Sequence, residues 1–472
     1  MLLDFLLQEP TSLAGYSRAL ALSPRRRKRV IITVVLLTFA FFLIFSSEPA
    51  EPEPQGKRKT SGLQSHKKPF FEFEPEEIDT LGAGPQSVII IRLTTFFAMF
   101  SILTREYVLP PGPPPRDTRS LSQDAQACVN RFQLNLDELY NNYTVYPPSY
   151  TLNDANQSTS DICSLIAKEA AYNRSVFPDV FGSRSLFQPN GSRVTLVTQV
   201  SFNRLFNLTT QAKHWPGPMS VAMYLPLFRL ETFVMDYCEA ESLNKRENIQ
   251  IHIMLDEGCY FFPTNVMRNL AMEYVYTSHS FITDGDHIPN PNMENNIIKH
   301  AEDGYLKGAT VMIIPAFEYT VMPEGFTMVH DKEELMKHWD EKYLKPFYID
   351  RFLPAYGPTN YTYWRTAEHP YTIEYGDQFE PYIVAETKLT HSYNNSFIGR
   401  FYNKAEHIAE FFARRFKFIV CNDCYEYHIP HTSVAGEHHV LYHHCMKNLY
   451  FDLREYLQKK YENRMPPPVK KW

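Results

Sequence analysis

The amino-acid sequence predicts an α/β fold with a mostly parallel central sheet. Short apolar runs alternate with amphipathic stretches along residues 193–289, and this strand–helix order is typical of parallel sheets. Further apolar runs at 311–314 and 416–420 add later strands. Two carboxylates, Asp284 and Asp286, follow one of these strands, at the sheet edge where ligands of such folds bind.

The individual elements can be assigned from hydrophobic periodicity. Strands are expected at 194–199, 219–224, 249–255, 311–314 and 416–420, with a further short strand that ends at Asp284. Helices are expected at 161–172, around 204–208, and at 227–237, 266–272 and 449–461. Strand and helix therefore alternate through the first half of the domain, as a mostly parallel sheet requires.

The N-terminal region has the pattern of a membrane anchor. Residues 30–45 are apolar and uncharged, and five cations at 25–29 directly precede them. We interpret this as an uncleaved signal anchor with its basic side in the cytoplasm, and a cleaved signal peptide is the alternative. The apolar run at 88–103 contains Arg92 and is interpreted as a stem helix or a packed edge, with a second span as the alternative.

The predicted organisation follows from this anchor. The segments are a cytoplasmic tail (1–29), a transmembrane helix (30–47), a Pro- and Glu-rich stem (48–116), a glycosylated extension (117–192), the main domain (193–463) and a tail (464–472).

Two features of the sequence agree with a lumenal domain. Seven Asn-x-Ser/Thr sequons occur, at Asn142, Asn156, Asn173, Asn190, Asn207, Asn360 and Asn394. Seven cysteines permit three disulfides and leave one thiol over. The Cys421-Asn-Asp-Cys424 stretch favours a short-loop disulfide, or pairing with Cys445 or Cys259, over a zinc site, because no second Cys-x-x-Cys pair exists.

Composition narrows the class of protein further. The net charge of −6 argues against nucleic acid as a partner, since such binders normally carry a basic face. Aromatic residues make up 14% of the chain, which suits sugar binding but equally suits an aromatic core.

The Asp284-Gly285-Asp286 triplet is the clearest chemical motif. Alternate side chains on a strand point the same way, so both carboxylates are expected to face one hard cation. Mg²⁺ or Mn²⁺ is held in this way when a substrate diphosphate completes the coordination shell. A solvated turn is the alternative interpretation of the triplet.

Nine segments in order carry a family resemblance. They are VTLVTQVSFNRL (194–205), HWPGPMSVAMYLP (214–226), FFPTNVMRNLAM (261–272), FITDGDHIP (281–289), IIPAFEY (313–319), GPTNYTYWRTAEHPY (357–371), QFEPYIV (378–384), NKAEHIAE (403–410) and YHIPH (427–431). Over about 193–461 the chain resembles the glucuronyltransferase family that contains β-1,4-glucuronyltransferase 1 and the second catalytic domain of the matriglycan-building xylosyl- and glucuronyltransferase.

The resemblance implies a fold and an activity. It implies a GT-A fold, a UDP-sugar donor (UDP-glucuronate as the leading choice), inversion at the anomeric carbon, and Mn²⁺, with Mg²⁺ as the alternative. It also implies a glycan acceptor on lumenal proteins. Together with the predicted anchor, it favours a single-pass type II protein of the Golgi membrane, and a homo- or hetero-dimer is a further option. The competing readings are an inactive carbohydrate-binding or scaffold protein and a nucleotide-sugar hydrolase.

The resemblance also assigns roles to residues. The metal ligands would be Asp284, Asp286 and His428, with His431 as the substitute for the histidine. Donor-binding residues would be Arg268, Asn269, Asp284, Arg365, Asn403 and Lys404, although a buried structural role for Arg268 and a salt bridge for Arg365 are equal alternatives. The catalytic base would be Glu380, with Asp377 as its substitute; Glu318 is a further retained carboxylate, and a structural role for Glu380 stays open.

One segment departs from the family pattern. Where the family has an acid, an arginine and a second glycine, this chain has Asn394, Ser396 and Phe401. Asn394 also heads a sequon, and a glycan there would crowd the mouth of the cleft. The changes predict either a different sugar or a loss of activity.

Overall fold

The protein is described here by a computed structural model. The structure describes residues 120–143, 159–182, 193–320, 329–429, 440–462 and 465–466. The expected cytoplasmic tail, the anchor and the whole stem lie outside these residues, as do the apolar run at 88–103 and His431. Within the described ranges, no helix has the length and apolar character needed to cross a membrane.

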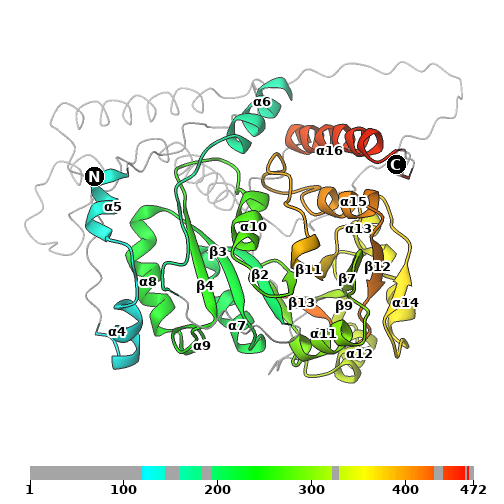
Figure 1. Cartoon of the computed structure of the whole chain (residues 1–472), viewed down its shortest axis with the longest axis horizontal. Helices are drawn as coiled ribbons and strands as arrows, with labels where there is room; N and C mark the ends of the chain where they lie inside the picture. The colour runs from blue at the N-terminus through cyan, green and yellow to red at the C-terminus, as the bar shows by residue number, and fades with distance from the viewer. Residues whose placement is uncertain are drawn as a thin grey trace, which may run out of the picture. The chain divides into compact units, whose positions relative to one another are not determined.

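The strands of the described residues form a nine-stranded sheet, in the order β1-β4-β3-β2-β5-β11-β7-β12-β10, and a four-stranded sheet, in the order β6-β13-β8-β9 (Figure 1). Their bounds are β1 Val176–Phe177, β2 Val194–Ser201, β3 Met219–Leu225, β4 Ile249–Leu255, β5 His279–Ile282, β6 His287–Pro289, β7 Thr310–Ile314, β8 Ala316–Tyr319, β9 Leu344–Pro346, β10 Tyr371–Ile373, β11 Tyr382–Glu386, β12 Lys417–Val420 and β13 Glu426–His428.

The large sheet is mixed, and the prediction of a mostly parallel sheet is only half correct. Strands β4, β3, β2 and β5 run parallel, as the strand–helix alternation requires. Strand β11 then lies antiparallel between β5 and β7, and both edge strands, β1 and β10, are also antiparallel. The edge strands β1 and β10 could not be read from periodicity, because they span only two and three residues.

Helices pack against the sheets and against one another. Their bounds are α4 Gln123–Val129, α5 Leu136–Asn142, α6 Thr159–Ala170, α7 Leu205–His214, α8 Leu230–Glu239, α9 Glu241–Asn244, α10 Thr264–Glu273, α11 Met293–Glu302, α12 Lys332–Asp340, α13 Leu353–Tyr356, α14 Tyr361–Trp364, α15 Ala405–Ala413 and α16 Val440–Lys460, with short 3₁₀ turns at 202–204, 227–229, 357–359 and 387–389. Helix α10 packs on β2 and β3, and α16 packs on α6 and α15 (Figure 1).

The region before residue 193 is built into the domain. Strand β1 adds an edge to the large sheet by pairing with β4. The Cys128–Cys238 disulfide joins α4 to α8, and Cys163–Cys445 joins α6 to α16. The third disulfide is Cys421–Cys424, and Cys259 is the remaining thiol, so the expected three bonds and one free cysteine are present.

The sequon hypothesis fails at one described position. Asn207 is buried inside α7, and its side-chain nitrogen lies below the surface. A glycan at Asn207 would require α7 to separate from the strands on which it packs. Asn360, by contrast, is exposed and caps α14 by accepting a hydrogen bond from the Tyr363 amide at 3.2 Å.

Candidate functional site

The acidic triplet lies in the connection between β5 and β6, not on a strand. Strand β5 ends at Ile282, and Gly285 and Asp286 form a turn. The prediction that strand alternation aims both carboxylates at one point is therefore wrong. A Cβ at Gly285 would lie 2.8 Å from the Gln199 carbonyl oxygen and closer still to Val200, so only glycine allows this close approach to β2.

Asp284 points into a cluster of positive and polar groups. Its Oδ1 accepts hydrogen bonds from Gln199 Nε2 at 2.6 Å and from Arg268 Nη2 at 2.7 Å. Its Oδ2 accepts from the Tyr382 hydroxyl at 2.9 Å and from Lys404 Nζ at 3.1 Å. The donors come from β2, α10, β11 and the residue before α15, so four separate segments converge on one carboxylate.

Two protein cations, Arg268 and Lys404, neutralise the Asp284 carboxylate. Burial alone would raise the pKa of the Asp284 carboxyl, but Lys404 and Arg268 together lower that pKa well below its usual range. The Arg268 side chain is 2% exposed, and Asn403 Oδ1 accepts from its Nη1 at 3.0 Å. Asn403 in turn donates to the Gly399 carbonyl at 2.9 Å, which ties the cluster to the 393–401 segment.

Sequence reasoning missed a chain of groups behind Asp284. The Tyr382 hydroxyl lies 2.9 Å from His287 Nε2, and His287 Nδ1 lies 3.3 Å from Glu426 Oε1. Thr283 donates to the other oxygen of Glu426 at 2.7 Å. All four side chains are buried. His287 and Tyr382 lie in two of the family-like segments, 281–289 and 378–384, but sequence reasoning assigned neither of them a role, and Glu426 gave no signal.

Asp286 faces the second sheet. Its Oδ2 lies 3.6 Å from His428 Nε2, and its side chain is 29% exposed. His428 is in register with His287 on β6 and with Glu318 on β8, so the three side chains lie on one row of the four-stranded sheet. The structure thus brings the predicted ligands Asp286 and His428 together across two strands that are remote in sequence.

The donor set around Asp286 fits a divalent cation. Octahedral ligands about 2.1 Å from an ion, at right angles to one another, lie roughly 3 Å apart. The 3.6 Å between the Asp286 oxygen and the His428 nitrogen needs only a small adjustment to reach that spacing. One carboxylate oxygen and one imidazole nitrogen suit Mn²⁺ better than Mg²⁺. Asp284 could contribute only while sharing its oxygens with Arg268 and Lys404.

Glu380 lies near this cluster. Burial raises the pKa of its carboxyl; Lys404 and Arg268 act in the opposite direction, and Asp284 adds to the increase. The Tyr402 backbone amide donates to the carboxylate. A carboxyl group with a raised pKa beside the charged cluster has the properties of a general base.

Three other predicted residues have structural contacts instead. Asp377 forms a buried ion pair with Arg454 of α16 and accepts a hydrogen bond from Tyr450 at 2.9 Å. Arg365 pairs with Asp340 at 2.6 Å and lies over the Trp339 ring, on the surface.

Asn269 likewise braces the chain. Its Nδ2 donates to the Tyr393 carbonyl and to Asn395 Oδ1, both at 2.8 Å. Glu318 lies 3.4 Å from Lys345 on the neighbouring strand. Among these residues, Glu318 shares the strand row of His428.

The altered 393–401 segment is fixed by the protein rather than open. The Asn394 side chain accepts from the Ser396 amide at 2.9 Å, and its backbone amide donates to Glu406 at 3.0 Å. Phe401, which replaces a glycine of the family pattern, has a φ of 64°. A phenylalanine rarely adopts this conformation, and the rings of Tyr442 and His443 on α16 pack against it.

Comparison with known proteins identifies the family of this chain. A protein-family model described as "Glycosyl-transferase for dystroglycan" matches residues 193–258 and 234–461, which is more than half of the chain. The chain belongs to this glycosyltransferase family. The resemblance seen in the sequence is therefore confirmed, over the same part of the chain.

Curated relatives agree with this assignment. The chain is 32% identical over 282 residues to the mouse (Mus musculus) xylosyl- and glucuronyltransferase LARGE1, covering 58% of this chain and 37% of that protein. It is 32% identical over 273 residues to human (Homo sapiens) LARGE1, covering 57% of this chain and 36% of the relative. The matched part thus spans little more than a third of these relatives.

A solved structure of GalNAc-T7 with UDP, GalNAc and Mn²⁺ aligns with a TM-score of 0.36 at 10% identity, covering 75% of this chain and 66% of that chain. A likeness at this level supports no conclusion about this protein.

Proposed function

We propose that this protein is a metal-dependent, inverting glycosyltransferase of GT-A type that transfers a sugar from a UDP-sugar to a glycan. The observation that carries the proposal is the 3.6 Å approach of Asp286 to His428, beside an Asp284 carboxylate that Arg268 and Lys404 hold ionised. Family membership supports the reaction class. Glucuronate is the leading donor sugar because the curated relatives are named xylosyl- and glucuronyltransferases.

The residues divide the work of the reaction. Asp286 and His428 would hold the divalent cation, Mn²⁺ in preference to Mg²⁺. When bound, the cation neutralises the charge that develops on the departing diphosphate. Lys404 and Arg268 keep Asp284 in position, so the turn that carries Asp286 cannot rotate away. Glu380 would accept the proton of the acceptor hydroxyl.

The proposed location is the lumenal side of the Golgi membrane, with a single N-terminal anchor. The apolar run at 30–45 and the basic cluster before it support the anchor. Three disulfides support an oxidising compartment. A glycan or glycoprotein acceptor fits that compartment, and a dimer stays part of the proposal.

A scaffold protein that kept the fold is the second candidate. The 393–401 segment favours it, because Phe401 stands at a positive φ where the family pattern has glycine. The intact Asp286–His428 pair favours the enzyme.

Release of UDP by the full-length chain tests the proposal. A panel of UDP-sugars is offered with Mn²⁺, with and without chelator, to the wild-type protein and to Asp286→Asn. The matched control is Asp340→Asn, which changes an exposed carboxylate on α12. Turnover with one sugar that chelator and Asp286→Asn abolish, but Asp340→Asn keeps, would support the enzyme. If no UDP-sugar of the panel gives UDP release although the protein still binds UDP, the scaffold function is favoured.

A further inference from the structure

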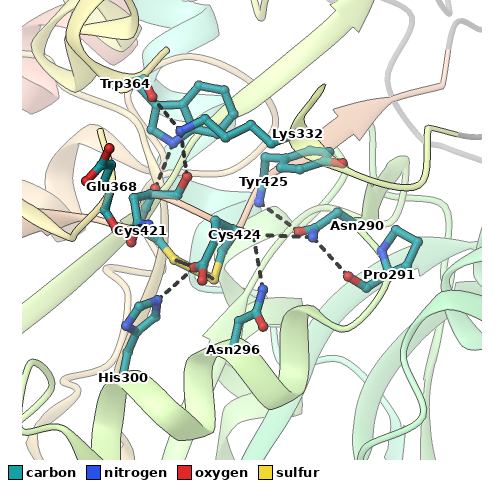
Figure 2. Close-up of a disulfide and its surroundings, with 12 residues drawn as sticks. Asn290, Pro291, Asn296, His300, Lys332, Trp364, Glu368, Cys421, Cys424 and Tyr425 are labelled. Atoms are coloured by element: carbon teal, nitrogen blue, oxygen red, sulfur yellow. Dashed lines mark hydrogen bonds and ion pairs between the residues drawn. A yellow bond between two sulfur atoms is a disulfide. The ribbon is translucent and has the colours of Figure 1, made fainter. Parts of the chain in front are cut away.

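Two sulfur atoms, a carboxylate and an imidazole meet at the loop between β12 and β13 (Figure 2). One potential ligand atom from each of His300, Cys421, Asp423 and Cys424 lies within 4.8 Å of all the others. Asp423 Oδ1 is 2.7 Å from His300 Nε2, and it is 3.2 Å and 3.6 Å from the sulfurs of Cys421 and Cys424. The site is separate from the Asp284 cluster and shares no residue with it.

The disulfide does not explain this convergence. A disulfide sulfur has no proton to donate, so neither the carboxylate nor the imidazole gains a hydrogen bond from it. Two sulfurs, one imidazole nitrogen and one carboxylate oxygen are, however, a usual ligand set for tetrahedral Zn²⁺. With metal–ligand bonds of about 2.0–2.3 Å, ligand atoms of a tetrahedron lie roughly 3.3–3.8 Å apart, which the Asp423–sulfur distances already approach.

The loop is held in place independently of the bond between its sulfurs. Trp364 Nε1 donates to the Cys421 carbonyl at 2.7 Å, and Lys332 Nζ donates to the Asn422 carbonyl at 2.9 Å. Asn296 Nδ2 donates to the Asp423 carbonyl at 3.2 Å. Figure 2 shows these side chains reaching the loop from several sides, with His300 and Asn296 both on α11. The backbone of the loop would therefore survive reduction of the disulfide, and only the two sulfur atoms must separate to reach tetrahedral spacing.

We propose that the dithiol form of this loop binds one Zn²⁺ through Cys421, Cys424, His300 and Asp423. Two molecules of a monothiol of the glutathione class reduce the bond, which gives two protein thiols and one small-molecule disulfide. Zn²⁺ then displaces the two thiol protons and is held as a bis-thiolate complex. The sequence alone disfavoured zinc because it lacks a second Cys-x-x-Cys pair; the fold supplies His300 and Asp423 in its place.

Burial separates this site from a thiol-exchange centre. Cys421 and Cys424 are both 0% exposed in the folded chain, so a small monothiol can attack the bond only when the loop opens at Asp423, and a macromolecular disulfide cannot reach either sulfur. The Asp423 side chain is 42% exposed and reaches solvent at the edge of the cluster. A small ion can enter along Asp423, which a protein partner cannot do.

The experiment uses cobalt as the probe on the full-length chain. The protein is treated with glutathione, and release of the Cys421 and Cys424 thiols is counted by alkylation and mass spectrometry. Glutathione is removed by desalting, because its own thiolate binds Co²⁺. Co²⁺ is then titrated while the thiolate-to-cobalt charge-transfer band is recorded, and Zn²⁺ is used to displace the cobalt. The band reports only thiolate ligands, so cobalt held by Asp286 does not contribute. The Cys421→Ser/Cys424→Ser double variant sets the background.

Two ligand variants and one matched control decide the outcome. Asp423→Asn and His300→Ala should each weaken cobalt binding at least tenfold, whereas His338→Ala, a partly buried histidine on α12, and Asp286→Asn should leave it unchanged. The Asp423→Asn substitution is isosteric, and the Asp423 side chain is partly exposed. This variant therefore tests the site even if His300→Ala fails to fold. Absence of the band after both thiols are released, equal affinity in Asp423→Asn, or a bond that glutathione cannot reduce in the folded chain would each overturn the proposal.

Discussion

Asp284 and Asp286 are two residues apart, yet they lie in opposite environments. Asp284 is surrounded by donors of the large sheet, among them Arg268 and Lys404, and is 23% exposed. Asp286 turns toward the small sheet, where its Oδ2 lies 3.6 Å from His428 Nε2. The turn at Gly285 separates them. A carboxylate whose charge is already matched by protein cations stabilises the fold, whereas one facing an imidazole at the surface is suited to a ligand.

The largest effect is expected from Asp284→Asn. The change leaves Arg268 buried beside a neutral amide, and breaking a buried ion pair costs about 3–5 kcal/mol of unfolding free energy. Urea unfolding should show this loss, and UDP release should fall to background. If the variant unfolds at the same urea concentration as the wild type, Asp284 does not stabilise the fold, and the contrast between Asp284 and Asp286 is lost.

Asp286→Asn should separate activity from stability. It removes an oxygen ligand from a partly exposed position, so UDP release should fall by about 10³-fold. The unfolding free energy should change by less than about 0.5 kcal/mol, because no buried cation loses its partner. Mn²⁺ binding measured by calorimetry should weaken in parallel. If Asp286→Asn lowered the unfolding free energy as much as Asp284→Asn, both carboxylates would stabilise the fold to the same extent.

Glu380→Gln tests the proposed base through pH. A base must be ionised to accept a proton, and burial raises the pKa of Glu380 above its ordinary value of 4.5. In the wild type, kcat/KM should therefore decrease as pH falls through a region above the ordinary carboxyl range. Glu380→Gln should lower kcat about 10²-fold and remove this acid limb. An acid limb that persists unchanged in the variant would assign the base to another group.

The smallest effect is expected from Arg365→Ala. Its ion pair with Asp340 is exposed, and such pairs contribute about 0–1 kcal/mol. UDP release should change less than twofold. A tenfold rise in KM for the UDP-sugar would instead show that Arg365 reaches the donor carboxylate during turnover.

The sequence predicted the parallel strands well, because β2, β3 and β4 carry their signal in their own apolar pattern. It did not predict β11, whose antiparallel partners lie far away along the chain. The same holds for the site. Short motifs and the family resemblance pointed to Asp286, Lys404 and His428, whereas Tyr382 enters the cluster only through the fold.

Asp377 shows the reverse case. This carboxylate beside a family-like segment had the residue type of a base, but in the fold it forms an ion pair with Arg454. Residue type and position along the chain cannot distinguish a reactive carboxylate from one that anchors a terminal helix. The distinction depends on which cations the fold brings within about 4 Å.

The Cys163–Cys445 disulfide has a consequence for biosynthesis. It joins α6 to the terminal helix across a sequence separation of 282 residues. While the chain emerges from the ribosome, Cys163 has no native partner until nearly the whole domain has been translated. This bond can therefore form only after Cys445 has been translated, and a chain that terminates before Cys445 would leave Cys163 exposed to wrong pairing.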